Sequence, residues 1–139
     1  LLWDIDFFKK VNDNYGHSAG DYILQEFSNA VGEELREEDT FARYGGEEFI
    51  ISLPHTSQKD ALEISERIRS KIENLNLTYG DDEINITTSL GVSTINEKDT
   101  YNSLIKRADE ALYHSKENGG RNCTSYHKDL DTILIYKKR

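Results

Sequence analysis

The chain has 139 residues and a formal net charge of −9, from 17 lysines and arginines against 26 aspartates and glutamates. This length fits one compact domain, and a hydrophobic content of 36% excludes a wholly disordered chain. The negative charge argues against passive binding to a nucleic-acid polymer or an anionic membrane, so a small phosphate ligand would need a local cation or a metal ion.

Cys123 is the single cysteine, so the chain can form no internal disulfide, and a reducing compartment such as the cytoplasm fits this usage. No apolar run approaches the roughly 20 residues of a membrane helix, and Asp4 and Asp6 interrupt the segment where a signal peptide is apolar. We therefore expect a soluble chain without a targeting signal. The absence of methionine and the opening on Leu1 and Leu2 further indicate a fragment of a longer polypeptide.

The first elements are predicted to be a strand and two helices. Residues 1–5 form an apolar run typical of a buried strand, with Asp4 and Asp6 at its C-terminal end. Asp6 is a candidate cap for a short helix over 7–15. Ser18 and Asp21 have the spacing of a capping box, and a second, amphipathic helix follows. Its apolar residues at helical spacing are Ile23, Phe27, Ala30, Val31 and Leu35.

The middle of the chain predicts a β-hairpin and a third helix. Aromatic and branched runs over 41–44 and 49–53 flank Gly45 and Gly46, which would supply the positive φ angles of a tight turn. Ser57 begins a capped helix, and we expect 74–82 to be a polar connection. The apolar face of that helix consists of Ala61, Ile64, Ile68, Ile72 and Leu75.

The last part predicts a half-buried strand from the alternation over 84–92 and a helix from the spacing over 104–112. That helix carries Lys116 in its last turn and stops at a glycine pair, after which 122–126 and 132–136 are weaker strand candidates. The order of elements favours an α+β fold, with helices over a mainly antiparallel, ferredoxin-like sheet and a central hairpin.

Two carboxylates are candidate metal ligands: Asp4 at the strand end and Glu47 at the hairpin tip. They converge if their strands are neighbours, and hard oxygen ligands of this kind hold Mg²⁺ together with phosphate oxygens. The alternative is that both are solvated loop carboxylates.

The start of the first helix has features of a phosphate site. Phe7, Phe8, Lys9 and Lys10 lie where free backbone N–H groups and a cation can hold a phosphate. The alternative places the phenylalanines in the core and the lysines at the surface.

Asn12 and Asp21 carry an amide and a carboxylate, which are able to read the edge of a purine. Taken singly, Asn12 is more often a polar surface group and Asp21 a capping residue. His17, beside Gly16, suits a turn, and a lone histidine is more often structural than catalytic.

Two further pairs of residues each include a cation that could bind a phosphate. Arg36 and Asp39, three residues apart, form either a local ion pair or a phosphate site. Lys116 and Arg121 flank Gly119 and Gly120, and they either face a triphosphate or offset the helix dipole.

Several sequence blocks follow one another in a fixed order. They are Asp4-Ile5-Asp6-Phe7-Phe8-Lys9, Asn12-Asp13, Gly16-His17 leading to Gly20-Asp21, Gly45-Gly46-Glu47-Glu48-Phe49, and Ala108-Asp109-Glu110-Ala111-Leu112-Tyr113 with Lys116. Together they resemble the GGDEF domain, the catalytic module of diguanylate cyclases, and the resemblance covers the whole chain, residues 1–139.

The resemblance implies that two GTP molecules, one on each domain of an antiparallel homodimer, condense to cyclic di-GMP and pyrophosphate. It places two Mg²⁺ ions, with Mn²⁺ as an alternative, on Asp4, the main-chain carbonyl of Ile5, and Glu47. Glu47 is also the implied proton acceptor, and Lys9 steadies the charge on the phosphates. The implied substrate-binding residues are Asn12 and Asp21 at guanine with His17 nearby, Phe7, Phe8, Gly45, Gly46, Lys116 and Arg121.

Arg36 and Asp39 match the RxxD motif of the family's inhibitory product site, which implies feedback inhibition by cyclic di-GMP. Two features depart from the family pattern. The Gly119-Gly120 connection is one residue longer than usual, and the opening helix with its DxLTGLxNR segment is absent, which predicts an exposed apolar patch on the sheet.

Two other interpretations stay open. The chain is alternatively an inactive GGDEF module that binds cyclic di-GMP at Arg36 and Asp39 and passes on a signal, or a ferredoxin-like structural domain without a ligand. A sensory or receiver module is the expected partner within the parent chain, and that parent could be anchored in a membrane.

Overall fold

The computed structural model describes residues 1–129 and 131–136. Its helices are α1 (Phe8–Tyr15), α2 (His17–Gly32), α3 (Gln58–Glu73) and α4 (Tyr101–Glu117). Its strands are β1 (Leu2–Ile5), β2 (Thr40–Arg43), β3 (Glu48–Ser52), β4 (Leu77–Tyr79), β5 (Asp82–Ile84), β6 (Thr88–Val92), β7 (Thr124–His127) and β8 (Ile133–Ile135).

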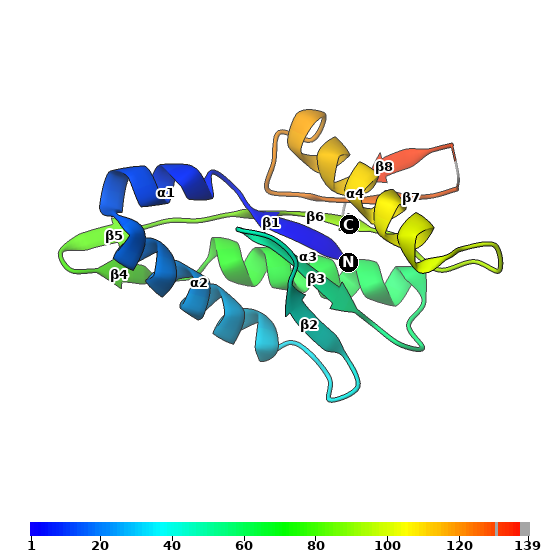
Figure 1. Ribbon diagram of the computed structural model, residues 1–139, viewed down its shortest axis with the longest axis horizontal. Coiled ribbons are helices and arrows are strands. Elements are labelled where there is room, and N and C mark those ends of the chain that lie inside the picture. The colour runs from blue at the N-terminus through cyan, green and yellow to red at the C-terminus, as the bar shows by residue number, and fades with distance from the viewer. Residues whose placement is uncertain (130, 137–139) are drawn as a thin grey trace.

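Six of these strands form one sheet in the order β2-β3-β1-β6-β7-β8, and β4 and β5 form a separate hairpin. All neighbours in the large sheet are antiparallel except β6 and β7, which are parallel. The predicted α+β class with a mainly antiparallel sheet is therefore confirmed. Figure 1 shows α1 and the β4–β5 hairpin at one end of the molecule and β7 and β8 toward the other.

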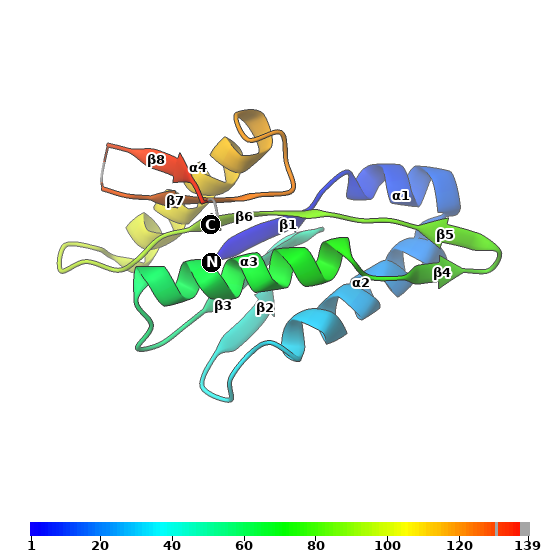
Figure 2. The ribbon, with the colours of Figure 1, turned by 180° about the vertical axis from the view of Figure 1, so that it is seen from behind.

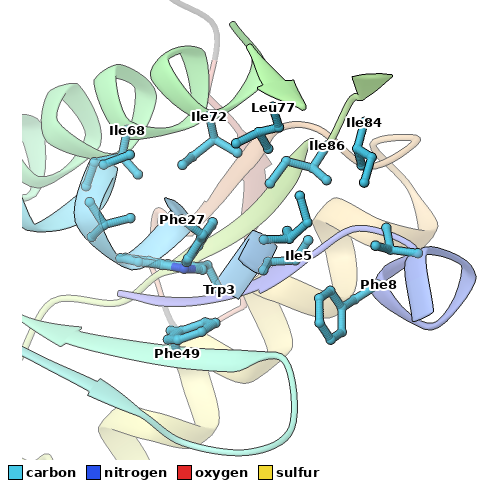
Figure 3. Packing of buried hydrophobic residues seen from close by; sticks show 14 of the residues in the cluster. Trp3, Ile5, Phe8, Phe27, Phe49, Ile68, Ile72, Leu77, Ile84 and Ile86 are labelled. Atoms are coloured by element: carbon cyan, nitrogen blue, oxygen red, sulfur yellow. The ribbon is translucent and has the colours of Figure 1, made fainter. Parts of the chain in front are cut away.

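Helices cover both faces of the sheet. Helix α4 lies in front of the strands in Figure 1, whereas α3 lies in front of them in Figure 2, the view from behind. The main core lies on the α2 and α3 side, where Trp3 contacts Phe27 and Phe49, with ring centroids 6.0 and 6.5 Å away (Figure 3). On the other face Leu2 packs against Ala108 and Leu112 of α4.

Gly91 of β6 allows the close approach of α4. A Cβ at this position would lie 2.2 Å from the carbonyl oxygen of Ala108 and 2.3 Å from the backbone nitrogen of Leu112. Because backbone atoms cannot move aside as a flexible side chain does, the α4–β6 contact requires glycine here.

Beside α4, the same face of the sheet holds a largely apolar groove with a volume of about 610 Å³. Leu1, Leu2 and Ile50 of the sheet and Leu104 and Ile105 of α4 are among its lining residues. Leu2 is only 1% exposed within this groove, and the exposed apolar patch predicted from the sequence stays a prediction.

The predicted caps of the first two helices are wrong. Phe7, in the left-handed conformation with φ 56°, is the N-cap of α1, and Asp6 makes no cap contact. Gly16 is the N-cap of α2, which begins at His17, so Ser18 and Asp21 lie inside the helix and form no capping box. The chain turns between the two helices at Gly16, whose φ of 91° suits glycine.

The predicted role of the glycine pair at the hairpin is also wrong. Gly45 and Gly46 join β2 to β3, but neither is among the residues with positive φ. Among the residues that the structure describes, no atom lies within 4 Å of a hypothetical Cβ at Gly46, and the nearest to one at Gly45 is Cβ of Glu48 at 3.7 Å. The pair therefore leaves the hairpin tip open to a ligand rather than supplying a left-handed turn.

The segment 74–82 is not a simple polar connection. It includes β4 and the start of β5, which pair around Gly80 at φ 61°. The predicted strand over 84–92 is split, because residues 85–87 lie between β5 and β6 and belong to neither strand. The Thr87 carbonyl in this segment accepts a hydrogen bond from the Asp6 N–H at 2.9 Å. Helix α2 also stops before Leu35, which packs on the core from the following loop.

Other predicted elements are confirmed with small shifts of their bounds. Ser57 caps α3 by accepting a hydrogen bond from the Asp60 N–H at 3.2 Å. The two weak strand candidates near the C-terminus correspond to β7 and β8. Within the part of the chain that the structure describes, every helix is too short or too polar to cross a membrane.

Candidate functional site

The site lies where β1 ends beside the β2–β3 hairpin. Asp4 and Glu48 are partners in the antiparallel register of β1 and β3, and the Ile5 N–H faces the Glu47 carbonyl at 3.4 Å. The strand that carries Asp4 and the turn that carries Glu47 are therefore neighbours, as the proposed metal site requires.

Asp4 is a buried carboxylate with two unlike oxygens. Its side chain forms an ion pair through Oδ2 with Nζ of Lys116, whereas Oδ1 is buried without a hydrogen-bond partner among the described residues. Burial raises the pKa of Asp4 to about 6, with Lys116 opposing the shift and the charges of Glu47 and Glu48 adding to it. An unpaired oxygen in such a position is costly unless a ligand satisfies it.

The chemistry of this donor set fits a hard divalent cation. Asp4 offers its unpaired oxygen, and Glu47 lies half-buried at the hairpin tip next to the end of β1. In the described part of the chain, no group of three His, Cys, Asp or Glu side chains could hold a metal by itself. A cation here would therefore share main-chain, water or phosphate oxygens, which is how Mg²⁺ usually binds.

Positive charge gathers around Phe7, next to the end of β1. The ring of Phe7 is 53% exposed, and Lys10 Nζ and the Arg121 guanidinium carbon lie 4.7 and 4.5 Å from its centroid. Phe8 instead is buried in the core, and Lys9 is exposed on α1. The core interpretation thus holds for Phe8, whereas Phe7 is a surface platform that two cations contact.

Asn12 and Asp21, the candidate purine contacts, come from adjacent helices. A Cβ at Gly20 would lie 1.9 Å from Oδ1 of Asn12, so Gly20 makes room for that amide. Asp21 and His17 are both exposed on α2. Asp21 also lines a cavity of about 400 Å³ between α2 and the hairpin, together with Leu24, Gln25, Ser28, Phe41, Ala42, Arg43 and Phe49.

Arg43 was not among the site residues predicted from the sequence. Its guanidinium donates from Nε to the carbonyl oxygens of Gly45 and Gly46, at 3.2 and 2.9 Å, and also binds Gly46 through Nη2. It therefore fixes the hairpin tip next to Glu47. Its position directly before the hairpin turn was the available signal.

Lys116 and Arg121 both reach the site, and both face carboxylates of the β1 end. Lys116 pairs with Asp4, while Nη1 of Arg121 lies 3.8 Å from Oδ1 of Asp6. The extra glycine of the connection takes a left-handed conformation at Gly120, with φ 73°. The connection thus still returns Arg121 to the site.

Arg36 and Asp39 form the ion pair predicted from their spacing, with Nη2 and Oδ1 3.0 Å apart. Hydrogen bonds to Asp39 raise the pKa of the Arg36 guanidinium. Arg36 also donates to Thr56 Oγ1 at 2.6 Å and to the Pro54 carbonyl at 3.3 Å. The pair is therefore a surface cluster in the loop after α2, anchored to the connection between β3 and α3.

Comparison with known proteins gives a consistent result. A family model described as "Diguanylate cyclase, GGDEF domain" matches residues 1–122. Diguanylate cyclase A of Treponema denticola is 47% identical over 125 residues, 89% of this chain and 34% of that protein. The response regulator PleD of Caulobacter vibrioides is 48% identical over 122 residues, 86% of this chain and 27% of PleD. The chain thus spans about a third or less of the length of these relatives.

Solved structures agree in fold. The GGDEF domain of DgcB from Caulobacter crescentus, crystallised in complex with c-di-GMP, superimposes with a TM-score of 0.88 at 32% identity, covering 92% of this chain and 76% of that one. The active GGEEF domain of a diguanylate cyclase from Vibrio cholerae superimposes with a TM-score of 0.84 at 32% identity, covering 92% of this chain and 81% of that one.

Proposed function

Because the chain belongs to the GGDEF family of diguanylate cyclase domains, we propose that it condenses two GTP molecules into cyclic di-GMP with release of two pyrophosphates. The observation that carries this proposal is the buried, unpaired Oδ1 of Asp4 beside the hairpin that bears Glu47. A buried carboxylate oxygen without a partner supports the proposal because it is suited to ligate a metal ion.

The proposed ligands of Mg²⁺ are Asp4, the Ile5 carbonyl and Glu47. When bound, the cation neutralises charge on the triphosphate and favours ionisation of the attacking hydroxyl. Glu47 accepts the proton of the 3′-hydroxyl, whose oxygen attacks the α-phosphorus of the other GTP while pyrophosphate leaves. Lys9, Lys116 and Arg121 offset the negative charge of the phosphates.

Guanine selectivity rests on Asp21 and Asn12. The Asp21 carboxylate accepts from the N1–H and N2–H₂ donors of guanine, and adenine lacks this pair of donors. The cavity that Asp21 lines has apolar walls in Leu24 and Phe41, which suits the faces of a purine ring.

The reaction needs two copies of the domain, because each copy supplies one GTP and the product is symmetric. We propose that Arg36 and Asp39 bind the product and inhibit synthesis, since they form a surface cluster apart from Glu47. An input module elsewhere in a longer cytoplasmic or membrane-anchored parent would control the encounter. The small share of its relatives that the chain spans supports this proposal. So does the diguanylate cyclase SiaD of Pseudomonas aeruginosa, which is 40% identical to this chain and was crystallised with its activator SiaC.

The second candidate function is a receptor that binds cyclic di-GMP without making it. The DgcB complex with c-di-GMP and the matching Arg36–Asp39 pair favour it as the alternative. Incubation with GTP and Mg²⁺ separates the two functions. We expect two pyrophosphates per cyclic di-GMP from GTP and no turnover of ATP, whereas product binding without turnover of GTP would support the receptor.

A further inference from the structure

The second carboxylate of the β1 end, Asp6, has no role in the mechanism above, yet it is 96% buried and makes several contacts. We propose that Asp6 is a positioning residue that holds the turn after α4, so that Arg121 faces the triphosphate over the ring of Phe7. This inference rests on the proposed function and adds a residue to its phosphate site.

Asp6 accepts hydrogen bonds from three groups of the chain. Thr87 Oγ1 donates to Oδ2 at 2.7 Å and Ser89 Oγ donates to Oδ1 at 2.6 Å. The backbone N–H of Asn122 donates to Oδ2 at 3.1 Å, from a loop 116 residues away in sequence. A buried carboxylate with three hydrogen-bond donors is held in one position, and it in turn holds the segments that carry those donors.

The turn that Asp6 holds has an unusual backbone. Gly120, Arg121 and Asn122 are consecutive left-handed residues, with φ of 73°, 68° and 47°. This conformation costs a glycine little but is disfavoured for Arg121 and Asn122, so it persists only where other contacts impose it. The hydrogen bond from the Asn122 N–H to Asp6 is one such contact.

Further contacts close the turn from other sides. The Arg121 N–H donates to the Ser115 carbonyl at 3.0 Å, and the Asn122 N–H is shared with Ser89 Oγ at 3.1 Å. The Asn122 side chain accepts from Arg69 Nη1 of α3 at 2.8 Å and also binds Glu73. The backbone course of the turn is thus determined before any ligand binds.

The consequence of this turn is the position of one charge. The Arg121 guanidinium lies 3.8 Å from Asp6 and 4.5 Å from the Phe7 centroid, with its side chain 30% exposed. Asp6 and Phe7 therefore hold one side of the guanidinium while the remainder stays open to solvent. Such an arrangement pre-orients a cation for phosphate oxygens, because fewer side-chain rotamers are lost on binding.

The test compares Asp6→Asn, Arg121→Ala and the double variant, with Asp82→Asn on exposed β5 as the matched control. The affinities for GTP and for GMP, which lacks the outer phosphates, are measured by calorimetry with Ca²⁺. We expect Asp6→Asn to weaken GTP binding about tenfold, because one oriented charge-assisted contact to the outer phosphates is lost. GMP binding should change little. The double variant should bind GTP no more weakly than Arg121→Ala, because Asp6 acts through Arg121.

Hydrogen exchange without nucleotide tests whether Asp6 holds the turn after α4. Asp6→Asn should speed exchange in 119–123 and leave α3 unchanged. Ser89→Ala keeps the Asp6 carboxylate and removes one of its donors, so it should also speed exchange in 119–123, but by less. It serves as the test if Asp6→Asn does not fold. Unchanged exchange in 119–123, equal weakening of GTP and GMP, or additive losses in the double variant would each overturn the inference. Failure of the unaltered chain to bind GTP would instead refute the proposed function, and the exchange result would still decide the role of Asp6.

Discussion

Lys116 in the last turn of α4 forms an ion pair with Asp4 of β1, across 112 residues of sequence. The ion pair uses Oδ2 of Asp4 and leaves Oδ1 without a partner among the described residues. The proposed metal ion can therefore bind Oδ1 while Lys116 stays paired with Oδ2. Asp4 and Lys116 are thus neighbours with different proposed tasks, as a metal ligand and a phosphate contact.

The burial of Asp4 predicts a pH-dependent cost to stability. Its folded-state pKa of about 6 lies above the ordinary 3.8, so the folded domain binds this proton more tightly than the unfolded chain does. The contribution of Asp4 to stability therefore falls as pH rises from about 4 to about 6, and the cost is complete above that range. We expect Asp4→Asn to raise the Tm of the ligand-free domain by about 3 °C at pH 7.5.

This gain should shrink as the pH falls below about 6 and disappear below about 3, where Asp4 is protonated in both states. Thermal unfolding followed by circular dichroism across the pH range measures it. A lower Tm for Asp4→Asn at pH 7.5 would mean that the ion pair with Lys116 outweighs the cost of burial.

Gly20→Ala should impair guanine binding through Asn12. The new Cβ would meet Oδ1 of Asn12 at 1.9 Å, and the amide must move because the helix backbone cannot. We expect the KM for GTP to rise about tenfold, equivalent to roughly 1.4 kcal/mol. Gly32→Ala at the end of α2 is the matched control and should leave KM unchanged, because no atom outside the helix's own backbone, within the described part of the chain, lies within 4 Å of the new Cβ. An unchanged KM for Gly20→Ala would remove Asn12 from the guanine site.

Arg36→Ala should relieve inhibition by cyclic di-GMP and leave the initial rate unchanged. The guanidinium lost here binds Asp39 and Thr56 on the surface and has no contact with the β1 end. Initial rates with increasing cyclic di-GMP measure the effect. Inhibition that persists would mean that Arg36 and Asp39 form only an ion pair within their loop and no product site.

Specific activity should rise with protein concentration, because two copies must meet to close the product. The net charge of −9 on each copy opposes this encounter, so moderate salt should increase the rate by screening. A dilution series combined with sedimentation tests this. Constant specific activity at concentrations where only monomer is present would contradict a reaction between two copies.

The sequence predicted the fold class and most of the element order from apolar periods, which are encoded locally. It predicted that Asp4 meets the Glu47 hairpin only if their strands are neighbours, and the pairing of β1 with β3 meets that condition. The contacts of Asp6 were not predictable, because its partners Thr87, Ser89 and Asn122 come from distant segments. A carboxylate just before a helix is a typical N-cap in a sequence pattern. Here the side chain of Asp6 instead accepts hydrogen bonds from these distant segments and does not cap α1.

The other wrong predictions concern short elements. Strands β4 and β5 have three residues each, too few for an alternating pattern to show within a polar segment. Phe7 and Phe8 are adjacent and identical in type, yet one is exposed and the other buried, because the helix begins between them. The direction of a side chain at a helix start depends on the cap conformation, which no residue type here specified.

The most direct measurement of the central claim is product formation by the unaltered chain and by Glu47→Gln, with GTP and Mg²⁺, followed by mass spectrometry. Glu63→Gln on the exposed side of α3 is the charge-matched control. We expect cyclic di-GMP from the unaltered chain and from Glu63→Gln. We expect none from Glu47→Gln, although the fold remains intact by circular dichroism, because the metal ligand and proton acceptor is lost. Cyclic di-GMP from Glu47→Gln at a near-normal rate, or none from the unaltered chain, would refute the proposed function.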